Sequence, residues 1–401
     1  MIPRLKPYFD FKEIKAACSF KPLSVENFES EFARKFGNKY GLTFLYGRSG
    51  LYALLKCLGI TNSEIIIPAY TCVVAAHAIV ASGNIPRFVD INPNDYNMNL
   101  DLVEQSINKK TKAIIGTALF GYPYDVKRLK NIIENSGKNI LLIQDCAHSF
   151  GAEFEGELIS GQGDASIFSF GISKQIASVR GGAITTNNEE IYKKLKNYRN
   201  DYFRNSSFID ELKTLHYFLS TYIVFWEPVY TIVNFFERKT SLLNSLVKYY
   251  DENKINMPKN FMENMPKISI RLGITQLEKY DKIKRKRIEN AAYYYEKLKN
   301  IAGITLPVPI NGATYSHFVI KVENREKTLK AMRKRGVQLG QIIEYAIPYM
   351  KAYGRYKTGE FPVSLDCSKR LVNLPVYPSL SKKQREYIAN SFMTVLMRRN
   401  N

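Results

Sequence analysis

The stretch SIFSFGISKQIASVRGG, residues 166–182, runs from an apolar, strand-like segment through a lysine, Lys174, to a pair of glycines. From residue 40 onward, similar β-rich runs alternate with amphipathic stretches. These runs are EIIIPAY, IPRFVDI, KAIIGTALFG, NILLIQDCA, ASIFSF and GGAITTN, at residues 64–70, 85–91, 112–121, 139–147, 165–170 and 181–187. The alternation predicts an α/β fold with a mostly parallel central sheet, in which ligands bind beyond the carboxyl ends of the strands.

The length of the chain predicts more than one domain. The 401 residues are 45% hydrophobic, which is enough to bury a large core. The last third changes character, because a long basic stretch at 273–300 leads to a strand, a helix, a second strand and a closing helix. We therefore expect a large domain at 1–260, with an apolar insert near 205–260, and a connecting helix with a smaller C-terminal α/β domain at 261–401.

The chain is strongly basic, with 58 Lys and Arg against 37 Asp and Glu and a formal net charge of +21. Such a charge suits nucleic acid, an anionic membrane surface or an anionic small substrate. The basic residues are spread through helical stretches, and no nucleic-acid motif accompanies them. We expect solvated helix faces to carry most of this charge, and we expect no nucleic-acid partner.

The cysteines and the N-terminus predict a cytoplasmic protein without a bound metal. No C-x-x-C pair and no Cys/His metal spacing occurs, which favours a reducing compartment. The first twenty residues lack the apolar core of a secretory signal. The five cysteines are Cys18, Cys57, Cys72, Cys146 and Cys367.

Residues 215–236, LHYFLSTYIVFWEPVYTIVNFF, form an apolar segment with basic residues on both sides. A transmembrane helix needs about 20 apolar residues, which this segment nearly has. Glu227 and Pro228 lie near its centre, however, where a carboxylate costs roughly 2.5–3.5 kcal/mol and a proline breaks the helix. We favour two short helices that pack on the body or on a partner subunit, over peripheral contact with a membrane surface.

Two local patterns precede Lys174 in the chain. In LYGRSGLYALLKCLGI, residues 45–60, Gly47, Arg48 and Ser49 begin an amphipathic helix, where the backbone N–H groups favour a phosphate. A Gly-Ser turn before a helix is more often only a cap. Asp145 ends the hydrophobic run NILLIQ, and it is either a turn residue or the partner of a cationic ring nitrogen.

Ser169 and Lys174 complete a possible cofactor site. Ser169 alternates with Phe168 and Phe170 along a strand, so its hydroxyl points away from both rings, and it precedes Lys174 by five residues. A lysine amine, a carboxylate, a hydroxyl and a phosphate-binding helix start are together what pyridoxal 5′-phosphate (PLP) requires. The sequence therefore predicts a PLP enzyme.

The chain resembles the DegT/DnrJ/StrS family of PLP-dependent sugar aminotransferases, which have the aspartate aminotransferase fold (fold type I). The resemblance covers nearly the whole chain, and its blocks occur in the family's order. They are VENFESEFARKFGNKYG (25–41), the helix start at 47–50, EIIIPAYTCVVAAHAIVASGNIPRFVDINPNDYNMN (64–99), IIGTALFGYPYDVKRL (114–129), QDCAHSFGA (144–152), GDASIFSFGISK (163–174), YSHFVIKV (315–322) and LVNLPVYPSLS (371–381).

The resemblance implies a role for each candidate residue. Lys174 is the Schiff-base lysine and proton shuttle, and Asp145 is the partner of the pyridinium nitrogen. Ser169 and the backbone around Gly47, Arg48 and Ser49 hold the phosphate, and His148 lies close to the ring. The implied partners are an amino-acid donor, usually glutamate, a keto sugar attached to a nucleotide, and a second copy of the chain in a homodimer.

The sequence departs from the family's pattern at several places, including SFGISK with Gln175 after the lysine, and two further departures concern contacts with the cofactor. Cys72 stands in PAYTC where the family often has an aromatic residue that stacks on the cofactor, so stacking is expected from Cys72, Tyr70 or another side chain. The run MENMPKISIRL replaces a segment that reaches the neighbouring subunit's phosphate in the family, and Asn264 is its candidate substitute. These departures and the apolar insert affect the expected identity of the substrate more than that of the cofactor.

Three alternatives remain open. A dehydratase of the same fold is disfavoured, because family members that dehydrate tend to replace the lysine. An inactive, basic, membrane-surface-associated binding protein is disfavoured by the joint presence of Lys174, Asp145 and Ser169. A lipid-linked acceptor in place of a nucleotide-linked one is kept because of the apolar insert.

Overall fold

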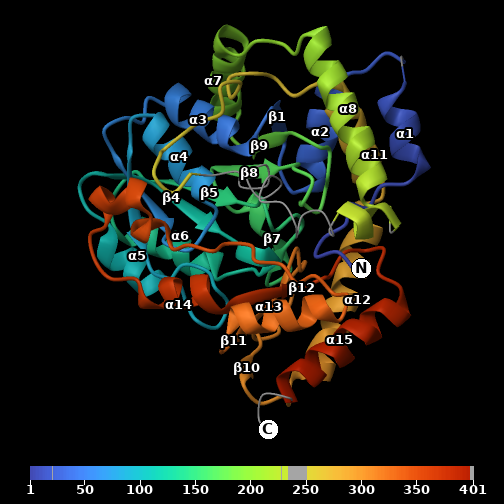
Figure 1. The fold of residues 1–401 in the computed structure, drawn as a ribbon. Coiled ribbons are helices and arrows are strands. Elements are labelled where there is room, and N and C mark those ends of the chain that lie inside the picture. The colour runs from blue at the N-terminus through green and yellow to red at the C-terminus, as the bar shows by residue number, and fades with distance from the viewer. Residues whose placement is uncertain (20, 227, 234–250, 398–401) are drawn as a thin grey trace.

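A computed structural model describes residues 1–19, 21–226, 228–233 and 251–397. Its central feature is a seven-stranded sheet in the order β1-β9-β8-β5-β4-β2-β3 (Figure 1). Strands β8, β5, β4, β2 and β3 run parallel, and β9 is antiparallel to both β8 and β1. The strands are β1 (Tyr40–Phe44), β2 (Glu64–Pro68), β3 (Ile85–Val89), β4 (Thr111–Thr117), β5 (Leu141–Asp145), β8 (Ala165–Ser169) and β9 (Gly182–Thr186).

The six strands predicted from sequence are all present in this sheet. Strand β1 was missed, because its five residues include a glycine and show little alternation. That glycine, Gly41, is required by packing, since a Cβ there would lie 2.6 Å from the carbonyl oxygen of Glu29 on α2.

Helices cover both faces of the sheet, and the strand residues alternate between the two layers. Ile65 and Ile67 of β2 pack in a core with α3, α4 and α7, whereas Ile66 packs in a second core with α2, α5, α6 and α11. The helices of these layers are α2 (Val25–Lys35), α3 (Gly47–Cys57), α4 (Val73–Ala81), α5 (Leu100–Ser106), α6 (Val126–Asn135), α7 (Glu189–Tyr202) and α11 (Lys267–Glu278). Two short strands, β6 (Glu153–Phe154) and β7 (Glu157–Leu158), form a hairpin.

A second, three-stranded sheet lies in the C-terminal third and has its own core. Its order is β10-β11-β12, and both pairs are antiparallel. The elements are α12 (Tyr280–Leu298), β10 (Ile304–Thr305), β11 (Phe318–Val322), α13 (Arg325–Lys334), α14 (Pro362–Arg370), β12 (Leu371–Leu374) and α15 (Lys382–Met397). The domain boundary between residues 260 and 261 stays a prediction.

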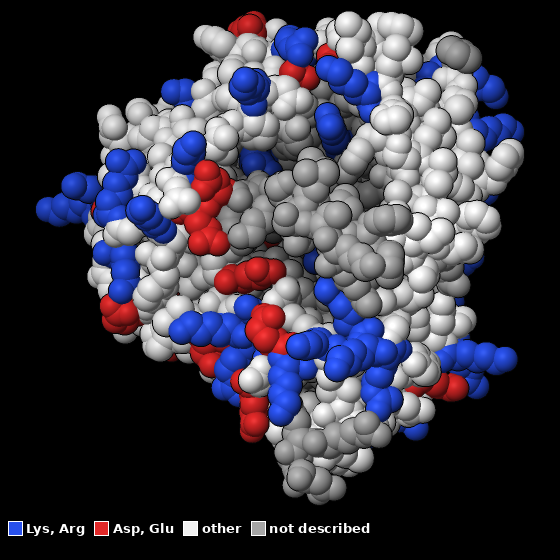
Figure 2. All heavy atoms as spheres, viewed as in Figure 1, with Lys and Arg blue, Asp and Glu red and all other residues white. Residues whose placement is uncertain are grey.

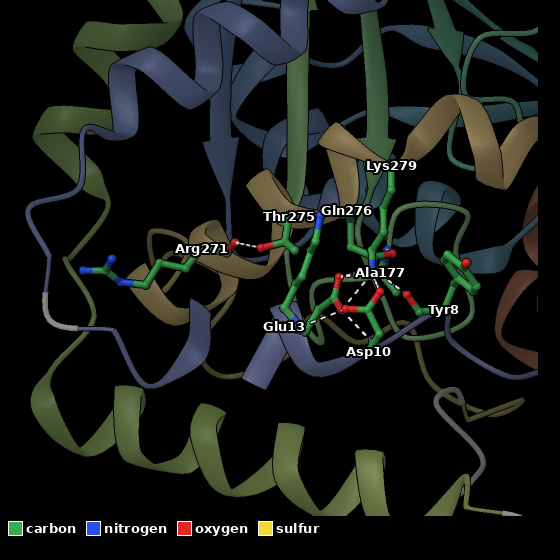
Figure 3. A network of polar contacts seen from close by, with 9 residues as sticks. Tyr8, Asp10, Glu13, Ala177, Arg271, Thr275, Gln276 and Lys279 are labelled. Atoms are coloured by element: carbon green, nitrogen blue, oxygen red, sulfur yellow. Dashed lines mark hydrogen bonds and ion pairs between the residues drawn. The ribbon is translucent and has the colours of Figure 1, made fainter. Parts of the chain in front are cut away.

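The connecting helix expected within 273–300 is two helices, α11 and α12, which meet at Lys279. The ammonium of Lys279 is turned towards α1 (Phe11–Ala17), where it pairs with Glu13 Oε1 at 2.6 Å and with Asp10 Oδ2 at 3.0 Å. Figure 3 shows this cluster, in which the fully buried Glu13 receives its compensating charge. A buried carboxylate without such a partner is strongly destabilising, so the cluster fixes α1 against α11.

The described part of the apolar insert contains α8 (Phe208–Val224), which packs on the body as favoured from sequence. Phe218 is buried, and its ring lies 5.3 Å from that of Phe9 in an edge-to-face arrangement. Glu227 and residues 234–236 lie outside the described residues. Within the described ranges, the structure contains no helix with the length and apolar character needed to cross a bilayer.

The distribution of charge agrees with solvated helix faces. On the side drawn in Figure 2, Lys and Arg are spread over the top, the left edge and the lower part of the molecule, with Asp and Glu among them. Ion pairs along helices account for part of this surface, as with Lys286 and Glu289 of α12, 2.7 Å apart. Exposed pairs of this kind contribute little to stability.

A buried histidine predicts acid sensitivity. His77 on α4 is 2% exposed, and burial together with the charge of Arg48 lowers its pKa to about 4. The unfolded chain takes up the proton near pH 6.5, so the contribution of His77 is present above that pH and is lost as pH falls towards 4. Between pH 7 and pH 5, we expect this residue to account for up to about 2 kcal/mol of lost stability.

The measurement is urea unfolding at both pH values for the wild type and His77→Gln. The Tyr353 hydroxyl lies 2.6 Å from His77 Nδ1, and glutamine retains a polar group for it. The variant should lose less stability than the wild type over this interval. His216, which is exposed on α8, provides the matched control as His216→Gln. An equal loss in all three proteins contradicts the prediction.

Candidate active site

A cavity of about 390 Å³ lies beyond the carboxyl ends of β4, β5 and β8, in the size range of small-molecule sites. It is lined by seven of the eight residues proposed from sequence, which are Gly47, Arg48, Cys72, Asp145, His148, Ser169 and Lys174. Ser49 is the exception. It lies within α3, is fully buried, and its hydroxyl has no hydrogen-bond partner among the described residues.

The start of α3 approaches the sheet closely. Tyr46 is the N-cap and makes no side-chain cap bond, while its carbonyl accepts from the N–H groups of Ser49 and Gly50 at 3.0 and 3.3 Å. The first N–H groups of a helix have no partner within the helix, and they attract anions. Gly182 on β9 allows this approach, because a Cβ there would lie 2.2 Å from the backbone nitrogen of Gly47.

Changing Gly182→Ala should therefore displace the start of α3. We expect a loss of roughly 3 kcal/mol of unfolding free energy, as for an overpacked core, together with weaker cofactor binding. The measurements are urea unfolding and PLP titration. Gly354→Ala is the matched control, because no atom lies within 4 Å of the position that its added methyl group would take, and its stability should be nearly unchanged. A Gly182→Ala protein as stable as this control contradicts the prediction.

Asp145 is the last residue of β5 and lies between two parallel neighbours, opposite Thr117 of β4 and Ile167 of β8. Its Oδ1 accepts a hydrogen bond from the backbone N–H of Ala147 at 3.0 Å. Burial raises the pKa of Asp145 above its ordinary value, and the Ala147 N–H and the charge of Lys174 oppose that rise. The carboxylate is therefore short of positive partners in the protein alone.

Lys174 follows β8 in a turn closed by its backbone N–H, which donates to the carbonyl of Gly171 at 2.8 Å. Burial lowers the pKa of the Lys174 ammonium, and the nearby Arg48 also lowers it, whereas Cys72 and Asp145 raise it. Burial is the largest of these effects. The neutral amine, which is the nucleophilic and proton-accepting form, is thereby made more accessible near neutral pH.

The loop after Lys174 is held by segments far away in the chain. Gln175 donates from Nε2 to the carbonyl of Thr314 at 3.0 Å, and the N–H of Ala177 donates to Gln276 Oε1 at 3.5 Å. Gln276 on α11 donates in turn from Nε2 to Glu13 Oε1 at 2.7 Å, so Figure 3 shows the loop tied to the α1–α11 cluster. Sequence reasoning missed these contacts.

Two histidines meet in the cavity wall. The rings of His148 and His317 are 5.0 Å apart, and the His148 ring lies nearly parallel to that of Phe120, at 16° and 6.2 Å. Burial lowers the pKa of both imidazoles well below the ordinary value, and the charge of Lys174 adds to this. His317, from the block at 315–322, packs against Phe120 and also lines the cavity.

Two further sequence candidates are placed as follows. Tyr70 is 1% exposed, and its hydroxyl donates to the carbonyl of Ile343 at 3.2 Å. Cys72 is part of the described cavity lining, whereas Tyr70 is absent from it. Asn264 donates from Nδ2 to Asn205 Oδ1 at 2.8 Å, also outside the lining. Asn264 as a contact to a neighbouring subunit stays a prediction.

The residues present fit PLP. Thr117 Oγ1 and His148 Nδ1, from two residues of the lining, are buried polar atoms without a partner in the described structure, and buried polar groups normally have one. Burial raises the pKa of Asp145 despite the charge of Lys174, so a cationic ring nitrogen would compensate this carboxylate. The start of α3 offers N–H groups to a phosphate. Thr117 gave no signal in the sequence.

Comparison with known proteins shows which family the whole chain resembles. The model of the DegT/DnrJ/EryC1/StrS aminotransferase family matches residues 22–217 and 238–393, and it leaves unmatched most of the apolar segment 215–236. The chain is 26% identical to the GDP-perosamine synthase of Vibrio cholerae, covering 97% of this chain and 98% of that one. It is 28% identical to the dTDP-3-amino-3,6-dideoxy-alpha-D-galactopyranose transaminase of Aneurinibacillus thermoaerophilus, covering 92% and 88%.

Among solved structures, the PLP form of the Streptococcus pneumoniae sugar aminotransferase Spr1654 superposes with a TM-score of 0.78 at 21% identity, covering 99% of each chain. The fold predicted from sequence is thereby confirmed, and the family match confirms the predicted family.

Proposed function

The chain belongs to the DegT/DnrJ/EryC1/StrS aminotransferase family, whose cofactor is PLP, and from this premise we propose that it transfers an amino group from glutamate to a nucleotide-linked keto sugar. The cofactor and the enzyme class predicted from sequence are confirmed by this membership. The observation that carries the proposal is the convergence of Lys174 and Asp145, from different segments, on one cavity beside the start of α3.

We assign the chemistry to Lys174 and Asp145. PLP, when bound, supplies an aldehyde that takes up the amino group and a ring that accepts electrons. Lys174 attaches the cofactor through its amine and, once released, moves a proton to and from the substrate's α-carbon as general base and acid. Its lowered pKa favours this role, because the neutral amine is the form that accepts a proton.

Asp145 holds positive charge at the ring nitrogen. A cation beside a buried carboxylate favours its ionised form, which reverses the effect of burial on the Asp145 pKa. The carboxylate is already in place at the end of β5 and does not reorganise during the reaction, which is the basis of electrostatic catalysis. His148 lines the same cavity.

We assign phosphate binding to Ser169 and the backbone N–H groups at the start of α3. Ser169 is the last residue of β8 and is paired with Gly182, the residue against which α3 begins. Arg48, the second residue of α3, adds positive charge on the same side of the cavity. Together these groups offer a hydroxyl donor, helix N–H groups and a guanidinium, which suits a phosphate dianion.

The substrate class rests on the curated relatives. Several act on nucleotide sugars by their names, including the GDP-perosamine synthase and the dTDP-sugar transaminase described above. A spore coat polysaccharide biosynthesis protein of Bacillus subtilis is also 26% identical over 89% of this chain. We therefore propose a role in building an amino sugar for a polysaccharide or glycoconjugate.

The test has two arms. In the first, borohydride reduction of the PLP-loaded protein, followed by peptide mass spectrometry, should locate the cofactor on Lys174. In the second, the purified protein is given glutamate and a panel of GDP-, dTDP- and UDP-linked keto sugars, and 2-oxoglutarate and amino sugar should form in equal amounts. Cofactor attachment without amino transfer to any sugar, including lipid-linked ones, favours the inactive binding protein instead.

We further propose that the protein is a cytoplasmic homodimer and that α8 contacts a membrane surface. Ile223 and Trp226 are 57% and 65% exposed, and the surface over α8 is mostly uncharged in Figure 2. An apolar patch on a basic protein suits an anionic bilayer. Sedimentation tests the dimer, and flotation with anionic and neutral vesicles, for wild type and Trp226→Ser, tests the membrane contact.

A further inference from the structure

Two arginines of the cavity wall have no part in the chemistry assigned above. Arg4, in the N-terminal segment, and Arg180, six residues after Lys174, both line the cavity. Among the residues that the structure describes, no carboxylate is within ion-pair distance of either guanidinium, and Asp145 is the only acidic residue of the lining. The cavity therefore holds more positive charge than a cofactor phosphate requires.

The backbone before Arg180 is strained. Val179 has a φ of 74°, in the left-handed region. Two hydrogen bonds join the residues on either side of it. The N–H of Arg180 donates to the carbonyl of Ser178 at 2.9 Å, and Ser178 Oγ donates to the carbonyl of Arg180 at 3.0 Å. A positive φ is a genuine outlier for a β-branched residue. Such strain persists where surrounding packing imposes it and is concentrated at ligand sites.

The packing that imposes this conformation comes from two helices. Val179 is buried with Phe218 of α8 and Leu272 of α11. The Arg180 guanidinium carbon lies 5.6 Å from the ring centroid of Tyr217, also on α8. A cation above a ring is held in place through its face, and the N–H groups at its edge stay available to an anion. The strained turn and Tyr217 together orient Arg180 before any ligand binds.

Arg4 is held in place by separate contacts. Ile2 forms a bridge with Val337, and the backbone N–H of Arg4 lies 3.4 Å from Gln338 Oε1. The N-terminal segment is therefore attached beside the small sheet, and Arg4 comes to the cavity from a part of the sequence far from Arg180. Two arginines from unrelated segments thus line one cavity.

We propose that Arg180, assisted by Arg4, forms a subsite for an oxyanion of the substrate, either a carboxylate of the amino donor or the diphosphate of the acceptor. This inference rests on the proposed function and names the side chains that would select its substrates. A guanidinium donates two parallel hydrogen bonds to a carboxylate or a phosphate, and an ammonium does not reproduce this geometry. In an alternating reaction, the two substrates occupy the same cavity in turn.

The test uses protein in which PLP attachment to Lys174 has first been verified, so that failure of the proposed function is detected separately. Calorimetric titration with glutarate, a dicarboxylate without an amino group, and with UDP, a nucleoside diphosphate, reports binding without turnover. For Arg180→Gln we expect a rise in Kd of about 10-fold or more for at least one probe, as for a lost charged hydrogen bond. Arg4→Gln should show a smaller rise.

Two further variants make the result decisive. Lys112→Gln, an exposed charge change on β4, is the matched control and should leave both Kd values unchanged. Tyr217→Ala keeps Arg180 but removes its support, and we expect a rise of about two- to fivefold. If Arg180→Gln binds glutarate more weakly, the subsite is assigned to the carboxylate of the amino donor. If it binds UDP more weakly, the subsite is assigned to the diphosphate of the acceptor. Unchanged Kd values for both probes in Arg180→Gln, or in Tyr217→Ala if the first variant does not fold, overturn the proposal.

Discussion

Replacing Lys174 with alanine is expected to lower kcat/KM for amino transfer by about three to four orders of magnitude, because the variant loses its general acid and base. It also loses the amine to which PLP attaches, so borohydride reduction should no longer place the cofactor on this peptide. The fold should persist, because Lys174 lies in a turn held by backbone bonds and by contacts of Gln175 and Ala177. The measurements are steady-state kinetics, peptide mass spectrometry and thermal unfolding.

Two controls separate catalysis from structure. Lys112→Ala removes an exposed lysine of β4 and should leave kinetics and unfolding unchanged. A small primary amine added to Lys174→Ala should restore part of the activity, because it supplies the missing proton acceptor in the cavity. Full activity of Lys174→Ala would contradict the proposed role of Lys174 in attaching PLP and transferring the proton. A cofactor found on another lysine of the wild type would contradict it as well.

Asp145→Asn is expected to change activity and stability in opposite directions. The amide has the same shape but no charge, so we expect kcat to fall by about 10²–10³-fold, as when one preorganised group is removed from an active site. In the cofactor-free protein, burial raises the Asp145 pKa above the unfolded value of 3.8. The ionised carboxylate is therefore disfavoured in the folded state near pH 7, and its replacement should raise the unfolding temperature.

The size of that stability effect also depends on pH. Because the folded pKa is the higher one, the folded protein binds the proton more tightly, and the contribution of Asp145 decreases as pH rises from about 4 towards neutrality. The gain for Asp145→Asn should thus be larger at pH 7 than at pH 4. PLP should reverse the order, since it pairs with the carboxylate of the wild type. Equal unfolding temperatures of both apo proteins at pH 7 contradict this account.

The amino-acid sequence alone determined the strands, the cofactor and the family. Six strands of the main sheet are short apolar runs that alternate with amphipathic stretches, and neighbouring residues alone form this pattern. The cofactor signal was local as well, since Ser169 and Lys174 are five residues apart and the glycine before Arg48 begins α3. Asp145 ends a buried strand, and parallel strands bring their carboxyl ends to one edge.

Only the tertiary structure determines which residues surround Lys174 and Asp145. Gln276 reaches the Lys174 loop from 99 residues away, and Arg4 and His317 come to the cavity from opposite ends of the chain. None has a local pattern, because a contact between distant segments depends on the path of the whole chain. Two further features depend on contacts between distant segments and were not predicted. Strand β1 pairs with β9, and packing by α8 and α11 imposes the strain at Val179.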